Sequence, residues 1–412
     1  MIDKVRVGSI AKSIMEVHFR TTEPLLVLGE PGIGKTEILI AKIKELLTRE
    51  FGKTKGFNVD DFWTIIDGSG MPSESLVVPY IDNDNVDRLQ RDVIPEFKKA
   101  KAFLLKKGNE DKKFVVFIDE LSSFTQDDQR TIMNFVQSGL LPDGTMLPND
   151  RIWVVCAGNP PRSIPGFEES DSPTHDIESA IITRCATYFV EADLDSWLEW
   201  GSNMSEKGRT HLHPYLLAAL KKLPELYNTK DKEDVRYLIN RSGYKLSQYL
   251  YEVEDMKEDG FDIHWEQFAL NSYVGAKIGT TLGATLSNLD KIIAPKELFG
   301  DDSKDKISKA MMDKFKTLQG FERYYLLMRC VVDDSPINYK KENNVLKLSQ
   351  LIAEGELPVE TGGALADFIL TNRSNKSSNA ARFMDNKILM KGGGYNVIAT
   401  LMDFQDQFRG IK

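Results

Sequence analysis

The feature that most constrains this chain is the segment GEPGIGKT, which lies between an apolar run and an amphipathic stretch. It fits the pattern G-x-x-x-x-G-K-[ST] and consists of Gly29, Glu30, Pro31, Gly32, Ile33, Gly34, Lys35 and Thr36. Residues 24–28 before it predict a buried strand, and the apolar spacing over residues 36–51 predicts a helix. The glycines let the backbone curl so that its N–H groups point inward at the positive end of that helix. This arrangement predicts a loop that binds the phosphates of a nucleotide.

Short apolar runs alternate with helical stretches as far as residue 190, which is typical of a parallel sheet covered by helices on both faces. Further strands are predicted at residues 62–66, 114–118, 152–157 and 186–190. A helix is predicted at residues 125–140 behind a Thr125 cap, followed by a hairpin at 141–148 with an Asp143-Gly144 turn.

The β signal ends near residue 190, and helical patterns dominate from residue 194 onward. We therefore expect three regions. They are an α/β nucleotide-binding domain at residues 1–193, an α-helical lid domain at 194–285, and a mostly helical C-terminal region of unknown role at 286–412.

Two carboxylates, Asp119 and Glu120, follow the predicted strand at residues 114–118. Open α/β sheets bind ligands at the carboxyl ends of their strands. We expect Asp119 and the hydroxyl of Thr36 to hold Mg²⁺, and Lys35 to bridge the β and γ phosphates. Glu120 is then expected to orient and polarise the attacking water. The alternative for the two acids is a helix cap or a solvated turn.

Asn159 follows the predicted strand at residues 152–157 and precedes two prolines. An amide at this strand end can hydrogen-bond the γ phosphate or the attacking water, and it loses that partner when the phosphate leaves. The alternative is an ordinary Asn-Pro turn. Next to two nucleotide-binding segments, the polar role is the favoured interpretation.

Together these segments resemble the AAA+ ATPases, and specifically their MoxR-like and dynein-related branch. The order GEPGIGKT, FVVFIDEL, a Leu-Pro-Asp-Gly hairpin and WVVCAGNPP is similar to that branch, and residues 71–76 are similar to its pre-insert motif. The resemblance covers residues 20–280. It implies an α/β fold with a P-loop AAA+ core, in which a parallel five-stranded sheet of order 5-1-4-3-2 is flanked by helices and followed by an α-helical lid.

The resemblance also implies ATP and Mg²⁺ as cofactors and a homo-oligomeric ring, most often hexameric. Arg184 resembles the arginine finger that completes a neighbouring subunit's site, and Arg241 resembles the second sensor on the lid, which binds nucleotide. Both segments depart from the family pattern, at Thr183 and Cys185 around the first arginine and at Asn240 before the second. The alternative for each is a surface arginine paired with a carboxylate.

The expected function is Mg-dependent ATP hydrolysis that remodels or moves a macromolecular client, with protein favoured and with a von Willebrand factor A domain partner implied by the resemblance. One alternative is a nucleic-acid-directed motor or loader that uses the lysine-rich stretch at residues 98–113, which otherwise is a solvated face. A second alternative is an ATP-binding structural or switch protein with little turnover. The sequence does not identify the client.

Composition narrows the remaining possibilities. The net charge of −9 disfavours general binding of polyanions. No apolar run reaches the length of a transmembrane helix and no secretory signal is recognisable, so we expect a cytoplasmic protein without membrane contact. Cys156, Cys185 and Cys330 are expected to be reduced, buried thiols. His211 and His213 are expected to be ordinary surface histidines.

Overall fold

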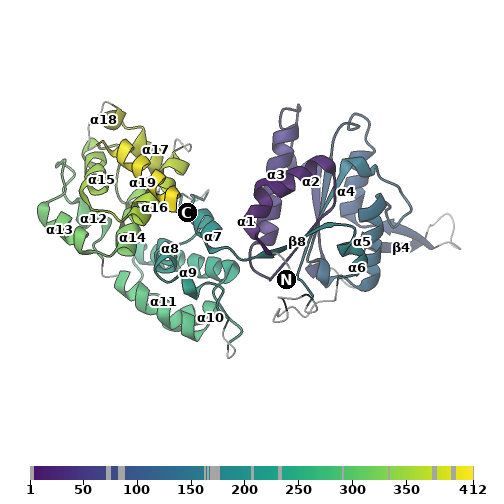
Figure 1. The fold of residues 1–412 in the computed structure, drawn as a ribbon, viewed down its shortest axis with the longest axis horizontal. Coiled ribbons are helices and arrows are strands. Elements are labelled where there is room, and N and C mark those ends of the chain that lie inside the picture. Colours follow the sequence, from purple (N-terminus) through teal and green to yellow (C-terminus); the bar gives the residue numbers. More distant parts are fainter. Residues whose placement is uncertain are drawn as a thin grey trace. The chain divides into compact units, whose positions relative to one another are not determined.

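The computed structural model divides the chain into two compact units, Met1–Asp193 (unit 1) and Leu194–Lys412 (unit 2). Figure 1 shows that unit 1 is built around a sheet and that unit 2 is helical. The structure describes residues 4–70, 76–81, 89–161, 164, 167, 177–205, 208–230, 234–289, 292–332, 335–373, 378–390 and 396–411. The expectation of an α/β fold with a parallel sheet, flanking helices and a helical C-terminal region is confirmed.

The described part of unit 1 contains a six-stranded parallel sheet in the order β1-β8-β2-β7-β6-β3. Its strands are β1 (Lys4–Arg6), β2 (Leu25–Gly29), β3 (Trp63–Asp67), β6 (Phe114–Asp119), β7 (Ile152–Gly158) and β8 (Ala186–Glu191). The prediction of five strands is wrong, so the order of the whole sheet differs from 5-1-4-3-2, although the five predicted strands keep that order among themselves. The additional strand, β1, pairs with β8 at the edge of the sheet. Its three residues, Lys-Val-Arg, are too few to show a β pattern in the sequence.

Helices cover both faces of this sheet, as Figure 1 shows. One face carries α1 (Val7–Ser9), α2 (Met15–Thr21) and α3 (Lys35–Phe51), and the other carries α4 (Pro95–Leu104), α5 (Gln126–Ser138) and α6 (Ser179–Ile182). Every residue of β2, β6 and β7 is buried, as strands covered on both faces require. This burial holds the central strands in place. The predicted site residues lie at the carboxyl ends of these strands.

The predicted helix and hairpin after β6 are both present. Thr125 caps α5, because its Oγ1 accepts a hydrogen bond from the backbone N–H of Asp128. The hairpin that follows is closed by an antiparallel bridge between Leu140 and Met146, with Gly144 at a φ of 82°. The Asp-Gly pair therefore forms the turn that the sequence predicts.

A separate two-stranded antiparallel sheet of β4 (Val77–Ile81) and β5 (Leu89–Val93) was not predicted. Neither strand has the apolar pattern of a typical β-strand, because β4 contains Pro79 and the interior of β5 is Gln-Arg-Asp. Residues 71–75 of the segment that resembles the pre-insert motif lie outside the described residues.

In the described part of unit 2 the regular elements are helices, apart from the isolated bridges Met204–Thr210 and Tyr227–Leu238. Its helices are α7 (Leu194–Ser202), α8 (Pro214–Lys222), α9 (Asn240–Glu258), α10 (Gln267–Val274), α11 (Ala276–Leu289), α12 (Pro295–Phe299), α13 (Lys309–Thr317), α14 (Gly320–Val331), α15 (Glu342–Glu354), α16 (Val359–Asn372), α17 (Asn379–Met384), α18 (Lys387–Met390) and α19 (Val397–Ile411). One cluster of buried apolar side chains extends from Trp197 to Leu401. This cluster includes residues on both sides of position 285, where a separate lid was predicted to end. The division of unit 2 at that position stays a prediction.

Two expectations drawn from composition can be compared with the fold. Cys156, Cys185 and Cys330 are all free and buried, as expected. Among the described residues, no helix combines the length and the apolar character that crossing a bilayer requires.

Candidate functional site: a phosphate loop and two strand-end acids

The predicted phosphate loop is shaped by two glycines in the left-handed region of backbone conformation. Gly32 and Gly34 have φ values of 82° and 88°, which residues with a Cβ rarely adopt. Gly34 immediately precedes α3, so the loop runs into the amino end of a helix of 17 residues. Backbone N–H groups at such an end lack intrahelical acceptors and carry partial positive charge. The loop thus has the shape and polarity that an anion needs.

Lys35 is buried and folds back over this loop. Its Nζ donates hydrogen bonds to the carbonyl oxygens of Gly29 (2.8 Å) and Glu30 (2.9 Å). Gly29 has no room for a side chain, because a Cβ there would lie 2.5 Å from Val190 Cγ2 and 2.8 Å from the Val190 carbonyl oxygen. The buried side chain of Ile33 also lies close, since its Cδ1 would be 2.9 Å from that Cβ. The ammonium group is therefore held at the loop whose amides would bind phosphate.

Asp119, the last residue of β6, is connected to the loop through Thr36. Thr36 Oγ1 donates to Asp119 Oδ2 over 2.7 Å, and Asp119 Oδ1 accepts from the backbone N–H of Glu120 over 3.0 Å. Burial raises the pKa of the Asp119 carboxyl group, and the hydrogen bond from Thr36 opposes this shift. A cation bound here would favour the charged carboxylate that burial disfavours.

Glu120 turns the chain sharply at the end of β6. Its φ of 50° and ψ of 45° are left-handed, which is uncommon for a residue with a side chain. Gly68 lies against this turn, and a Cβ on it would come within 2.8 Å of the Glu120 carbonyl oxygen. Unfavourable backbone conformations of this kind persist where the surrounding structure holds them, often at functional sites.

Asn159 joins the loop to the acid pair. It follows β7, and its Oδ1 accepts a hydrogen bond from Lys35 Nζ over 3.2 Å, while its Nδ2 donates to Glu120 Oε2 over 3.2 Å. The structure thus brings together five residues that the sequence singled out at separate places: Lys35, Thr36, Asp119, Glu120 and Asn159. The loop and the strand-end acids face the same site.

Two further residues at this edge were missed by the sequence analysis. Asp67 ends β3 in direct register with Asp119, and its Oδ1 accepts hydrogen bonds from the backbone and hydroxyl of Ser69. Ser122 is fully buried, and its Oγ accepts from the backbone N–H of Asn159 over 3.3 Å. The signal for Asp67 was available, because it is an acid directly after a predicted strand, like Asp119. No local pattern marks Ser122.

The residues present fit the cofactors that the sequence predicts. Thr36 and Asp119 offer a hydroxyl and a carboxylate oxygen, the hard ligands that Mg²⁺ prefers. The glycine turns, the amino end of α3 and the ammonium of Lys35 offer donors and positive charge to a chain of phosphates. The groups that ATP and Mg²⁺ require are therefore already present among these residues.

The two predicted arginines are not among the residues that these hydrogen bonds connect. Arg184 follows α6 on the surface of unit 1, where its guanidinium donates to Gln137 Oε1 and to the Ala180 carbonyl oxygen, both over 2.9 Å. These partners are neutral groups, not the carboxylate of the alternative interpretation. Arg241 is exposed near the beginning of α9 in unit 2. The roles of both arginines stay predictions.

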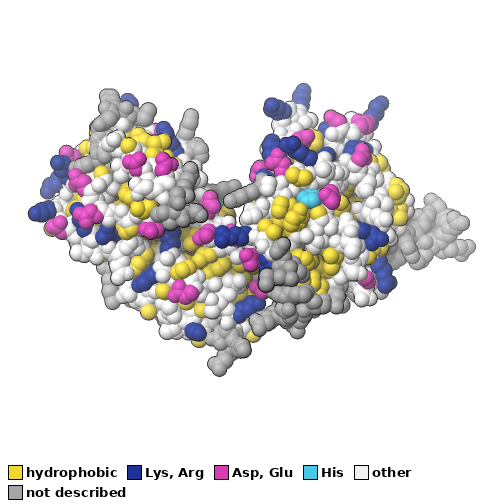
Figure 2. Space-filling model, in the orientation of Figure 1, with side chains coloured by type: hydrophobic (Ala, Val, Ile, Leu, Met, Phe, Trp, Pro, Cys, Tyr) yellow, Lys and Arg dark blue, Asp and Glu magenta, His cyan; other side chains and the backbone are white. Residues whose placement is uncertain are grey.

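The lysine-rich stretch at residues 98–113 is largely used inside unit 1. Lysines that donate hydrogen bonds to other residues of this unit are Lys98 to Asp92, Lys99 to the carbonyls of Asp60 and Trp63, Lys101 to Asp143 and Thr145, Lys112 to Asn109, and Lys113 to the carbonyls of Phe19 and Arg20. On the face drawn in Figure 2, basic and acidic side chains are interspersed. The stretch therefore has a structural use that does not require a polyanion.

The expectation that both histidines lie on the surface is wrong for His213. This residue is completely buried at the amino end of α8, where its Nδ1 accepts from the backbone N–H of Tyr215. Its Nε2 lies 3.1 Å from Glu254 Oε2, and Arg329 Nη1 donates to both oxygens of the same carboxylate over 2.9 and 2.8 Å. His211 is partly buried and stacks on a tryptophan ring. Among the described residues, no group of three or more His, Cys, Asp or Glu side chains is arranged to hold a metal ion.

Comparison with solved structures gives low overall similarity. NtrX from Brucella abortus has a TM-score of 0.37 and 12% identity, over 80% of this chain and 63% of its own. PCH-2 from C. elegans has a TM-score of 0.30 and 10% identity, over 69% and 67% of the two chains. A DNA polymerase III gamma subunit-related protein from Thermotoga maritima has a TM-score of 0.28 and 11% identity, over 98% and 99%. With TM-scores below 0.5, these similarities do not bear on function.

Sequence comparison is more specific, although no curated protein matches the chain. Residues 25–166 match the sequence model of the family described as AAA, the ATPase family associated with various cellular activities. The matched range begins with β2 and contains the phosphate loop, the strand-end acids and Asn159. Residues 25–166 are therefore similar in sequence to the AAA family of ATPases.

Proposed function

We propose that this chain hydrolyses ATP with Mg²⁺ at the site in unit 1 and uses the energy to remodel or move a macromolecular client. The observation that carries this proposal is the hydrogen-bonded connection from the phosphate loop to the strand-end acids, through Thr36 on one side and Asn159 on the other. A chance glycine turn would not be connected in this way to two acids from another strand.

Each residue then has one role. The loop amides and Lys35 bind and orient the phosphates, and Thr36 and Asp119 hold Mg²⁺, which offsets phosphate charge during transfer. Glu120 orients the attacking water and accepts its proton. Asn159 positions the Glu120 carboxylate through the hydrogen bond from its Nδ2.

The first experiment separates binding from turnover. We expect Lys35→Ala to lose ATP binding, and Glu120→Gln to bind ATP but lose turnover by at least about 100-fold, because the amide cannot accept the proton. Lys53→Ala and Glu50→Gln are matched controls, since both residues are exposed in unit 1 and outside the site. Undiminished hydrolysis in Glu120→Gln would contradict its role. ATP binding without turnover in the unmodified protein would favour the alternative of an ATP-dependent switch.

We further propose that the active form is a homo-oligomeric ring, expected to be hexameric, in which Arg184 completes the site of a neighbouring subunit. The exposure of Arg184 supports this, and so does the neutral character of the two partners that the described residues give it, Gln137 and the Ala180 carbonyl. Exchanging neutral acceptors for a phosphate costs a guanidinium less than leaving a carboxylate. Arg241 is proposed to sense nucleotide from unit 2.

A mixing experiment tests the shared site. Arg184→Ala and Glu120→Gln are each expected to be inactive, whereas a 1:1 mixture should recover about a quarter of the normal rate, because some sites then combine two intact halves. Arg49→Ala, another exposed arginine of unit 1, should stay active alone. An active Arg184→Ala protein at all concentrations, or a mixture without recovery, would contradict the proposal.

For the client, we propose a protein, and for the family branch the MoxR-like one. Lysines of the stretch at residues 98–113 donate hydrogen bonds within unit 1, which makes this stretch a less favourable DNA contact for a nucleic-acid motor. The hairpin directly before β7 supports the branch, which in turn implies a partner with a von Willebrand factor A domain. Stimulation of ATP hydrolysis by DNA, falling steeply as salt rises, would instead identify the nucleic-acid alternative.

A further inference from the structure

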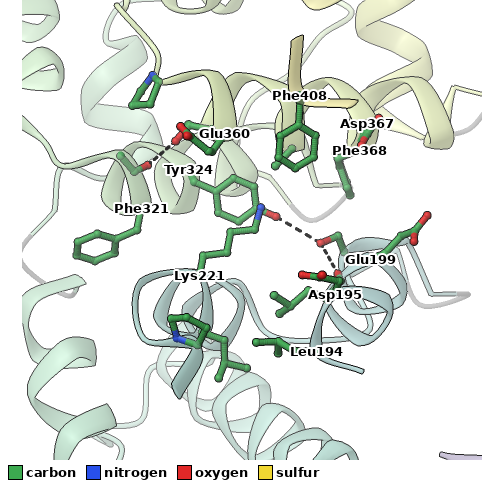
Figure 3. Close-up of a pocket in the computed structure, with 18 of the residues that line it drawn as sticks. Leu194, Asp195, Glu199, Lys221, Phe321, Tyr324, Glu360, Asp367, Phe368 and Phe408 are labelled. Carbon is green, nitrogen blue, oxygen red and sulfur yellow. Dashed lines mark hydrogen bonds between the residues drawn. The ribbon is translucent and has the colours of Figure 1, made fainter. Parts of the chain in front are cut away.

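Unit 2 contains a pocket of about 690 Å³ that the ATPase site does not involve. Its walls come from α7 and α8 on one side and from α14, α16 and α19 on the other, as Figure 3 shows. All of the lining residues belong to unit 2. The volume lies in the range of pockets that bind small molecules or short peptide segments.

Large apolar side chains line the pocket from both sides. They are Leu194, Leu198, Leu220, Phe321, Phe368 and Phe408. Phe408 reaches the pocket because α16 and α19 approach closely at a pair of glycines. A Cβ on Gly363 would lie 2.3 Å from Phe408 Cβ, and a Cβ on Gly362 would lie 2.5 Å from the ring of Phe404. The apolar surface is therefore built by helix packing and is in place without a ligand.

Polar groups on these walls are fixed by the protein itself. Lys221 Nζ lies 3.9 Å from the centre of the Tyr324 ring, and Figure 3 shows it directed toward that ring. The Tyr324 hydroxyl is 3.4 Å from Ser202 Oγ, which donates to the Leu198 carbonyl oxygen over 2.8 Å. These contacts hold the walls in one arrangement and place the ammonium on an aromatic face.

The charges on the lining are predominantly negative. Among the described residues, the lining has four carboxylates, Asp195 and Glu199 on α7 and Glu360 and Asp367 on α16, and one lysine, Lys221. The carboxylates come from opposite walls: Figure 3 shows Glu360 and Asp367 in its upper part and Asp195 and Glu199 below them. A negative field confined between low-dielectric walls attracts cations and repels phosphates.

We propose that this pocket binds a short peptide segment of a partner protein, in which a Lys or Arg is next to a large apolar residue. The apolar residue and the stem of the basic side chain would cover the leucine and phenylalanine walls, while the charged head would reach the carboxylates. Charge complementarity favours a peptide of this kind over nucleic acid, and the apolar walls favour it over a small polyamine. The inference is independent of the proposed ATPase activity, because the pocket and its charges belong to unit 2.

Binding can be measured by fluorescence anisotropy with the full chain and three pools of labelled hexapeptides. In the first pool each peptide has one Lys or Arg beside one Leu, Phe or Trp. In the second the basic residue is replaced by Glu, and in the third the apolar residue is replaced by Ser. We expect saturable binding of the first pool only, and at most weak competition by unlabelled spermidine.

Two variants locate the binding. Glu199→Gln/Glu360→Gln removes two exposed carboxylates of the lining and should weaken binding about tenfold. Ala364→Trp fills the pocket and should abolish it. The control Glu252→Gln/Glu266→Gln changes net charge equally at exposed positions outside the lining and should leave affinity within about twofold.

The expected pattern would support the proposal. Absence of saturable binding by the first pool, equal binding of all three pools, equal loss in the two double variants, or full displacement by spermidine would each overturn it. The readout is peptide binding and not ATP hydrolysis. Absence of peptide binding would therefore not contradict the proposed ATPase function, and absence of ATP hydrolysis would not contradict peptide binding.

Discussion

The carboxylate of Glu254 allows a stability prediction whose size follows from the structure. It lies on α9 and receives hydrogen bonds from Arg329 on α14, while the buried His213 lies 3.1 Å away. Burial alone would raise the pKa of Glu254, but the charges and hydrogen bonds of His213 and Arg329 outweigh it and lower the pKa from 4.5 to about 2. Folding therefore favours the ionised form.

The lowered pKa sets both the magnitude and the direction of the pH dependence. A carboxyl group whose pKa falls from 4.5 in the unfolded chain to about 2 in the fold contributes about 3 kcal/mol at pH 7. Because the folded-state pKa is the lower one, this contribution is complete above the unfolded pKa and is lost as the pH falls toward about 2. At pH 3.5 roughly 2 kcal/mol should remain.

We expect Glu254→Gln to lower the free energy of unfolding by about 3 kcal/mol at pH 7, since it leaves the Arg329 guanidinium without its counter-charge. Urea unfolding followed by circular dichroism at pH 7 and pH 3.5 measures this, with the transition of unit 2 fitted separately. Glu252→Gln, exposed on the same helix, is the control and should change stability by less than about 0.5 kcal/mol. A loss within about 1 kcal/mol of the control, or a difference that does not shrink at pH 3.5, would refute the reasoning.

Three further predictions concern the sites. Gly29→Ala should lower stability by about 1–3 kcal/mol and weaken ATP binding, because its Cβ would collide with Val190; an unchanged melting temperature and nucleotide affinity would contradict this. Asn159→Ala should slow ATP hydrolysis about 10- to 100-fold while ATP affinity changes little, since Glu120 loses a donor; a matching loss in affinity would assign Asn159 to binding instead. Gly363→Ala should destabilise unit 2 by about 1–3 kcal/mol and abolish peptide binding to its pocket, and normal binding would show that the close approach of α16 and α19 is not required.

The sequence predicted that the site residues converge at one edge of the sheet, because the signals for this are local. Apolar runs too short for helices placed β2, β6 and β7, and the acids and Asn159 follow such runs directly. Parallel strands bring their carboxyl ends to one edge, so residues far apart in the chain converge there without any long-range information. Asp67 obeys the same rule, and it was missed only because no second motif drew attention to its strand.

What the sequence did not predict depends on partners that are distant in the chain. The buried His213 lies next to Glu254, which Arg329 contacts, and both residues come from other helices. The sequence around the histidine does not indicate these partners. β1 exists because its short backbone pairs with β8, not because of its side chains. The pocket of unit 2 is assembled from five helices, whose apolar periodicity indicates burial but not which faces meet.

Asn159 has a consequence for the timing of the reaction. One amide contacts both the lysine that would bind phosphate and the glutamate that would take a proton from water. If phosphate oxygens drew the ammonium away, the Asn159 side chain would lose its hydrogen bond from Lys35 while it still donates to Glu120. The proposed phosphate-binding lysine and the proposed base are thus coupled through a single amide side chain, and a change at one of them would be felt at the other.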